Sequence, residues 1–148
     1  MRGLVMANKK QKFIELKDID NLVPAEFVTI EIKPMGYVRR TRADAWKKRP
    51  EVLNYYAFLD ELRWKLGNFK LENCFEIIFG LPFPDSYSEK KKEQLLGMPH
   101  QIKPDLDNLI KAASDGLRGV GENNDSRIYK FRSEKVWSKK GFIKIRNI

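Results

Sequence analysis

Two periods of hydrophobicity divide this chain into predicted strands and helices. Residues 27–32 alternate apolar and polar side chains at every second position, which predicts a half-buried strand. Residues 71–81 predict a second strand, because they are rich in β-branched and aromatic side chains and are followed by prolines. Residues 126–137 and 141–145 have the same character, and the turn at residues 138–141 predicts that these two strands pair with each other.

A helical period appears between the first two strands. From Pro50 onward, apolar residues recur every three or four positions, and Gly67 is a suitable residue to end that helix. The predicted buried face of this helix comprises Val52, Tyr56, Leu59, Leu62 (or Arg63) and Leu66.

Two shorter helices are predicted in the second half of the chain. Ser86 or Ser88 is a suitable N-cap for a polar helix that runs to about Leu96. Asp107 is predicted to begin the other helix, which ends at the glycines that follow Leu117. The apolar face of this second helix comprises Leu109, Ile110, Ala113 and Leu117.

The order of these elements, βαβ(α)αββ, predicts the fold class. We expect an α+β (α/β) fold: a single compact domain with a mixed β-sheet, partly antiparallel at its C-terminal end, and helices packed on it. A length of 148 residues with 42% hydrophobic residues suits one domain with its own core. We assign this domain to residues 25–148 and leave residues 1–24, whose periodicity is weak, as an unassigned N-terminal leader.

The scarcity of cysteine and histidine excludes several classes of site. With Cys74 as the single cysteine, the chain has no disulfide framework and no multi-cysteine zinc site. A single histidine, His100, argues against a histidine-based metal site or a histidine-dependent catalytic triad. The sequence shows neither a membrane-spanning apolar run nor a signal peptide, so we expect a reducing, cytoplasmic location and no membrane partner.

Positive charge dominates the chain but is unevenly distributed. The net charge is +9, from 29 Lys plus Arg against 20 Asp plus Glu, which makes a polyanion the first partner to consider. Residues 33–49 hold seven basic residues and one acid, and residues 127–146 hold eight basic residues and one acid. Residues 104–125, between them, hold five acids and two basic residues. A nuclease needs such an arrangement, although a solvated face is the alternative for any one charged run.

The acidic segment carries the candidate chemistry. Asp105 and Asp107 are two residues apart just before a helix, where extended backbone would point both carboxylates the same way. Such oxygen ligands suit Mg²⁺, which binds one or two carboxylates and keeps several water molecules. Lys111, one helical turn after Asp107, could neutralise charge on a phosphate, and Asp125 could supply a third carboxylate. These residues predict metal-assisted phosphodiester hydrolysis.

Purely structural roles remain open for the same residues. Asp107 is also a good N-cap, Asp107 and Lys111 could form an i,i+4 ion pair, and Asp125 could belong to an ordinary turn. We interpret Asp115, four residues after Lys111, as a supporting residue rather than a metal ligand. If all these roles are structural, the chain is a non-catalytic, basic nucleic-acid-binding module.

The segment KPDLDNLIKA, at residues 103–112, resembles a motif of the RusA family of Holliday-junction resolvases, small endonucleases typical of bacteria, prophages and phages. The resemblance extends over residues 27–145. One difference is that family members often have two consecutive aspartates where this chain has Asn124 and Asp125. Shorter matching motifs are FP at residues 83–84, DGL at 115–117, NDSRI at 124–128 and the basic segment at 37–46.

The resemblance implies an activity and the roles of individual residues. It implies a bacterial or phage-encoded endonuclease, dependent on Mg²⁺ (or Mn²⁺), that resolves four-way DNA junctions by paired symmetrical nicks in recombination and repair. The enzyme would be a homodimer without a small-molecule cofactor. A nuclease acting on another branched DNA or on RNA is the alternative.

Individual residues take roles under this resemblance. Asp105, Asp107 and Asp125 would be the catalytic carboxylates that bind the metal, and Lys111 would be the essential lysine. The residues predicted to bind nucleic acid are Arg39, Arg40, Arg42 and Lys103.

Overall fold

The computed structural model describes the chain in six segments. Side chains at residues 4–14, 44, 45 and 125 lie outside the description, although the backbone of most of them is described. The described segments are residues 4–8, 11–14, 26–39, 41–45, 49–118 and 125–148.

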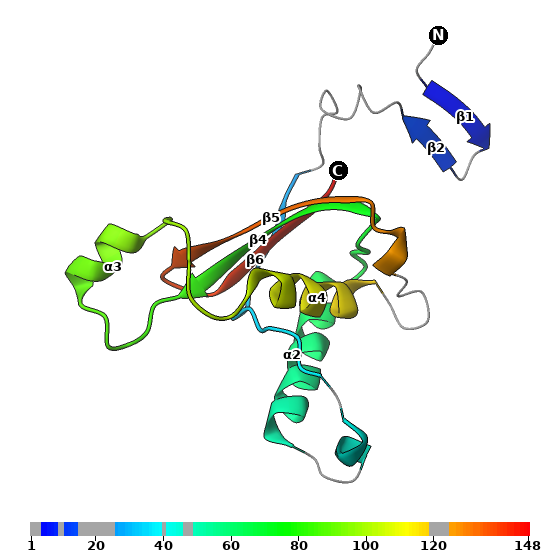
Figure 1. Ribbon diagram of the computed structural model, residues 1–148. Coiled ribbons are helices and arrows are strands. Elements are labelled where there is room, and N and C mark those ends of the chain that lie inside the picture. Colours follow the sequence, from blue (N-terminus) through cyan, green and yellow to red (C-terminus); the bar gives the residue numbers. More distant parts are fainter. Residues whose placement is uncertain (1–3, 9–10, 15–25, 40, 46–48, 119–124) are drawn as a thin grey trace.

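Four strands form a mixed sheet whose order in space differs from their order in the chain (Figure 1). The strands are β3 (Val28–Glu31), β4 (Cys74–Pro82), β5 (Lys130–Ser138) and β6 (Phe142–Asn147), and their spatial order is β3-β6-β4-β5. Strand β6 is antiparallel to both β3 and β4, whereas β5 is parallel to β4. The prediction of a mixed sheet within an α+β fold is therefore confirmed.

The predicted pairing of the last two strands is wrong. Strands β5 and β6 are separated by β4, which pairs with both of them. Strand β4 contains Phe75 and Ile77, both with 0% exposure, and such a strand is best covered when it has a neighbour on each side. The turn after β5 does reverse the chain, but it carries the chain past the end of β4, where Pro82 is opposite Ser138.

Two helices cover one face of the sheet and enclose the core against it. Helices α2 (Pro50–Leu66) and α4 (Leu106–Leu117) lie on the same side of the sheet, and α3 (Glu89–Leu95) lies beyond its end (Figure 1). Helix α4 packs against both α2 and β5. The largest fully buried side chains are Phe75, Phe79, Leu62, Ile77, Leu109, Ile143 and Ile145.

The ends of α2 and α3 agree with the helix-start and helix-end residues predicted from the sequence. Helix α2 begins at Pro50, and Gly67 after it has a φ of 56°, a left-handed conformation that glycine adopts without a steric penalty. Ser88 rather than Ser86 caps α3, because its Oγ accepts a hydrogen bond from the Lys91 amide at 3.2 Å.

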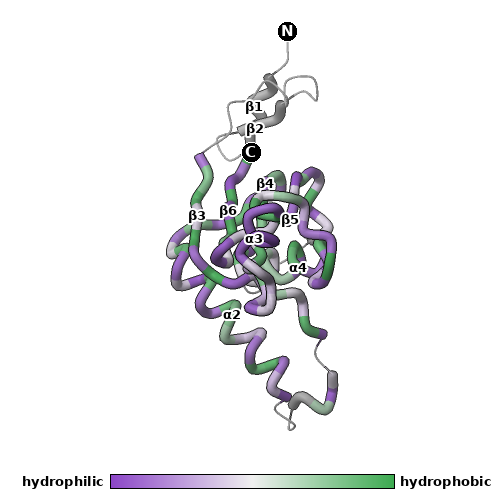
Figure 2. Tube along the Cα trace, turned by 90° about the vertical axis from the view of Figure 1, so that its left-hand side faces the viewer, coloured by the Kyte–Doolittle hydropathy of each residue, from purple (hydrophilic) through white to green (hydrophobic). Residues whose placement is uncertain are grey.

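The predicted buried face of α2 includes Tyr56, which is exposed, and omits Tyr55 and Phe58, which are buried. Tyr55 is 5% exposed and belongs to the core, whereas Tyr56 is 42% exposed. Either tyrosine fits a helical period with Val52 and Leu59, so periodicity alone does not choose between them. Hydrophilic and hydrophobic residues alternate along α2, and its N-terminal end extends away from the sheet (Figure 2).

The N-terminal segment contains a separate pair of strands. Strands β1 (Leu4–Asn8) and β2 (Gln11–Ile14) form an antiparallel two-stranded sheet within the segment that the sequence left unassigned. Among the described residues, no helix is long and apolar enough to cross a membrane.

Gly116 allows α4 to approach α2 closely. A Cβ atom at this position would lie 2.8 Å from Leu62 Cδ2, which is inside van der Waals contact. We therefore expect Gly116→Val to lower the free energy of unfolding by about 1–3 kcal/mol, as overpacked core substitutions do. Chemical denaturation of the purified variant measures this loss.

A double-mutant cycle separates this contact from helix propensity. Leu62→Val makes room at the crossing, so Gly116→Val should cost less in that background than in the wild-type chain. Equal costs in the two backgrounds would contradict the packing explanation.

Candidate functional site

The N-terminal end of α4 carries two of the predicted carboxylates. Asp105 is the N-cap residue, with extended backbone (φ −68°, ψ 142°) and no capping hydrogen bond from its side chain. Asp107 is exposed in the first turn, where its Oδ1 accepts a hydrogen bond from the Asn108 amide at 3.0 Å. The positive end of the helix dipole favours negative charge at both positions.

The local backbone differs from the predicted one by a residue. The sequence predicts that Asp105 and Asp107 lie on extended backbone and that the helix begins at Asp107. In the structure, α4 begins at Leu106, so Asp107 is already helical. Asp105 is therefore the N-cap, and the alternative in which Asp107 takes that position is wrong. Both carboxylates come from one helix end, not from alternation along a strand.

Segments that are distant in the chain form hydrogen bonds with the first turn of α4 and with the residues just before it. The Tyr37 amide donates a hydrogen bond to the Asn108 carbonyl at 3.0 Å, which ties the loop after β3 to the first turn of α4. From β5, the Lys135 ammonium donates to the carbonyls of Ile102 at 2.5 Å and Pro104 at 2.6 Å. Hydrogen bonds from two segments that are distant in the chain therefore hold the backbone around Asp105 and Asp107.

Lys111 lies on α4, one turn after Asp107, with 44% of its side chain exposed. Its Nζ is 3.8 Å from Asp115 Oδ1 and 5.0 Å from the centre of the Tyr37 ring. The ammonium is therefore held by a carboxylate on one side and an aromatic face on another. The predicted supporting role of Asp115 agrees with this arrangement.

Tyr55 of α2 in turn holds Asp115. Its hydroxyl donates a hydrogen bond to Asp115 Oδ2 at 2.8 Å, and its ring packs edge-on against Tyr37 at 5.8 Å. Burial, and next the hydrogen bond to Asp115, raises the pKa of the Tyr55 hydroxyl, so it stays protonated and remains a donor. Arg63 adds hydrogen bonds to the carbonyls of Asp115 (3.3 Å) and Gly116 (3.1 Å).

The sequence analysis did not place Tyr55 in this network. Tyr55 comes from a different helix and lies 60 positions before Asp115 in the chain. The helical spacing of apolar residues along α2 favours Tyr56 as much as Tyr55. Only the packing of α2 on α4 brings its hydroxyl to Asp115.

Removal of this hydroxyl should destabilise the protein. Tyr55→Phe removes the hydroxyl that donates to Asp115 Oδ2 in a part-buried position, which should lower the free energy of unfolding by about 1–3 kcal/mol. Tyr56→Phe is the matched control on the exposed side of α2 and should change it by less than about 0.5 kcal/mol. Urea denaturation measures both, and equal effects would contradict the structural role of the bond.

A cavity of about 330 Å³ lies beside these residues. Asp107 and Lys111, one helical turn apart on α4, both line it. Its other walls are formed mainly by side chains from α4 and from the approach to β5: Ile110, Ser114, Ile128 and Phe131. The sequence singled out none of these four residues for the site.

Asp125 begins a short 3₁₀ turn, η2 (Asp125–Arg127), just before Ile128 of the cavity wall. Its side chain lies outside the described residues, so its role as the third carboxylate stays a prediction. Among the side chains that are described, no group of three or more His, Cys, Asp or Glu could hold a metal ion.

The predicted nucleic-acid-binding residues are on the surface where they are described. Arg39, Arg42 and Lys103 are exposed, and the Arg39 carbonyl accepts a hydrogen bond from Arg49 at 3.0 Å. Arg40 lies outside the described residues. Their predicted contact with nucleic acid stays a prediction.

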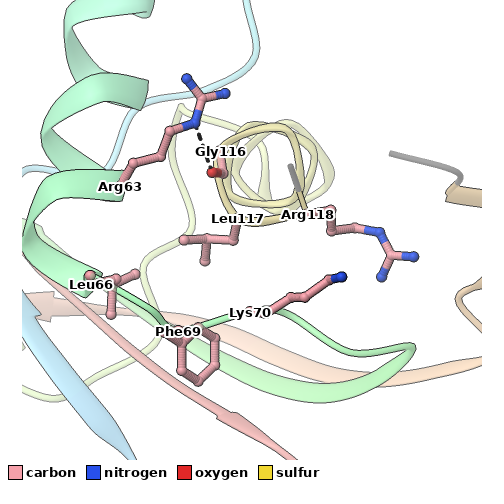
Figure 3. Close-up of a pocket in the computed structure, with 8 residues that line it drawn as sticks. Arg63, Leu66, Phe69, Lys70, Gly116, Leu117 and Arg118 are labelled. Carbon is pink, nitrogen blue, oxygen red and sulfur yellow. Dashed lines mark hydrogen bonds between the residues drawn. The ribbon is translucent and has the colours of Figure 1, made fainter. Parts of the chain in front are cut away.

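A second cavity, of about 350 Å³, lies at the opposite end of α4 (Figure 3). Three cations, Arg63, Lys70 and Arg118, line it together with apolar residues. Arg63 bonds the last carbonyls of α4, and Arg118, which is 5% exposed, bonds the Glu72 carbonyl at 3.0 Å and Asn73 Oδ1 at 2.7 Å. The two arginines therefore secure the helix end.

Comparison with known proteins gives one finding. The sequence model of a family described as Endodeoxyribonuclease RusA matches residues 31–146, which include α2, β4, α3, α4, β5, most of β6 and the residues that line both cavities, but only the last residue of β3. No curated protein matches the chain.

Proposed function

We propose that this chain, which belongs to the RusA endodeoxyribonuclease family, resolves four-way DNA junctions by paired, symmetrical, Mg²⁺-dependent nicks. The family implies nuclease activity on Holliday-junction DNA. The dependence on metal, the pairing of the nicks and a role in recombination and repair are the parts that we add.

One observation supports the proposal most strongly. Asp107 and Lys111 line the same cavity, at the end of α4 where Asp105 is the N-cap. This end of the helix lies within the family match and carries the motif that resembles the family. The Asp107 carboxylate and the Lys111 ammonium are therefore held close together on one helix, where a phosphate and its metal ion could contact both.

The carboxylates present fit a hard divalent cation. Asp105 makes no capping bond, and Asp107 uses only its Oδ1 for the Asn108 amide, so both aspartates have carboxylate oxygens to offer. Asp105 and Asp107, with Asp125 as the proposed third ligand, would hold Mg²⁺, or Mn²⁺ in its place. When bound, such an ion activates water and neutralises charge on the attacked phosphate.

The remaining residues have roles of their own in this proposal. Lys111 would donate a hydrogen bond to a non-bridging phosphate oxygen, where negative charge grows during hydrolysis. Asp115 and Tyr55 hold its ammonium in place through the 3.8 Å ion pair and the 2.8 Å hydrogen bond. Arg39, Arg40, Arg42 and Lys103 would bind flanking phosphates and supply no sequence preference.

Paired nicks require two active sites. A four-way junction has two equivalent strands to cut, and a two-fold symmetric homodimer matches that symmetry. We therefore propose that the active form is a homodimer, in which each chain contributes one carboxylate-bearing end of α4.

Binding and cleavage of a synthetic four-way junction, compared with a linear duplex of the same sequence, test this function. We expect tighter binding to the junction at the same salt concentration, and cleavage with Mg²⁺ or Mn²⁺ but not with EDTA. Binding of the junction without cleavage under either metal would favour a non-catalytic binding module. Preferential cleavage of RNA or of another branched DNA would replace the substrate class.

A further inference from the structure

The cavity beside Asp107 and Lys111 combines charged and apolar lining residues. Asp107 and Lys111 are its charged residues, and Ile110, Ile128 and Phe131 are its apolar ones. Its volume of about 330 Å³ is at the small end of the range for ligand sites, which suits a single planar group rather than a peptide or a duplex.

Phe131 is the aromatic residue among the described residues that line this cavity. It is 47% exposed near the start of β5, which is one of the two edge strands of the described four-stranded sheet. Its ring is stacked on Phe75, with centres 5.6 Å apart and planes inclined by 12°, and Phe75 has 0% exposure. The core therefore fixes the ring plane, and Phe131 presents a preorganised aromatic surface to the cavity.

We propose that this cavity receives one nucleobase, unstacked from the DNA, next to the phosphate that is cut. This inference rests on the proposed function and specifies how that site holds its substrate. A nucleotide joins an anionic phosphate to a flat, largely apolar base. The cavity likewise has Lys111 and Asp107, a proposed metal ligand, in the same lining as the aromatic ring of Phe131. Bases stack on exposed aromatic side chains with little dependence on sequence.

The substrate favours such an arrangement. Unstacking a base costs least where pairing is already weakened, as at the exchange point of a four-way junction. A base held in this cavity would fix the adjacent phosphate relative to Asp107 and Lys111 and would favour junctions over intact duplexes. The cavity at the other end of α4 does not compete for this role, because its arginines hold backbone carbonyls and the Asn73 side chain.

A cycle that combines a protein variant with a DNA variant tests the proposal. Each nucleotide flanking the mapped cut is replaced in turn by an abasic residue, and dissociation constants are measured by fluorescence anisotropy with Ca²⁺ in place of Mg²⁺. For wild-type protein, we expect one abasic position to weaken binding about 5- to 100-fold. Phe131→Ala should weaken binding of the intact junction by a similar factor, and the abasic change should then add almost nothing.

Two further variants keep the result interpretable. Phe131→Trp preserves an aromatic surface and should retain both wild-type binding and the abasic penalty. Tyr129→Ala removes an aromatic residue of the same segment that is 70% exposed and does not line the cavity, so it should leave the penalty unchanged. Thermal melting shows whether Phe131→Ala is folded, and the abasic series on wild-type protein needs no variant.

The outcomes separate this inference from the proposed function. If wild-type protein binds and cuts the junction but no abasic position matters, or the penalty persists in Phe131→Ala, the base site is wrong and the nuclease remains. If wild-type protein does not bind the junction, the proposed function fails and this inference fails with it.

Discussion

Asp107→Asn should abolish cleavage of a four-way junction while the protein still binds it. The substitution keeps the size of the side chain and the acceptor for the Asn108 amide, but it removes a negative charge that a divalent cation requires. Loss of a group that only orients a metal ligand already costs about 10–100-fold, so loss of a ligand itself should cost at least about 100-fold in rate. Single-turnover cleavage with Mg²⁺ measures this rate.

Binding of the junction provides the internal control for this variant. One acid fewer beside the DNA should leave the affinity unchanged or raise it, because repulsion of the phosphates falls. Asp85→Asn makes the same charge change at an exposed position before α3 and should leave both rate and affinity unchanged. Cleavage at the wild-type rate by Asp107→Asn would show that Asp107 has no part in metal binding.

Lys111→Met should cause the second largest loss. Methionine preserves most of the length and apolar stem of lysine but removes the cation, so the charge that develops on the phosphate loses the donor that we propose for it. Loss of one such donor typically costs about 10²–10³-fold in kcat. Because the effect is on the transition state, KM should change far less than kcat.

A matched lysine elsewhere distinguishes catalysis from general attraction to DNA. Lys90→Met removes an exposed cation from α3, so it should leave kcat unchanged. Equal reductions of kcat by Lys90→Met and Lys111→Met would indicate that Lys111 acts only through net charge. A change in KM alone for Lys111→Met would assign it to binding.

Local sequence patterns predicted the elements of this fold better than their arrangement. The bounds of α2 follow from Pro50 and Gly67, because proline and glycine act on the backbone at their own positions. The position of β4 between β5 and β6 depends on burial of Phe75 and Ile77 by segments far apart in the chain. A turn motif contains no information of that kind.

The residues of the candidate site also fall into those that local sequence predicted and those that only the packing reveals. Asp105, Asp107 and Lys111 fall within one short segment, so their spacing alone indicated that they act together, and the structure places Asp107 and Lys111 on one cavity. Tyr55 and Phe131 reach that region from α2 and β5, and only the packing of these elements on α4 reveals them. Asp125 stays a prediction from the sequence.

Mapping the cut sites on all four strands of one junction, with wild-type protein and Mg²⁺, tests the central claim most directly. We predict nicks on two opposing strands at symmetry-related positions, with 5′-phosphate and 3′-hydroxyl ends that DNA ligase reseals. Nicks scattered over all four strands, equal cleavage of linear duplex, or stable binding without any nick would contradict resolution of the junction by this chain.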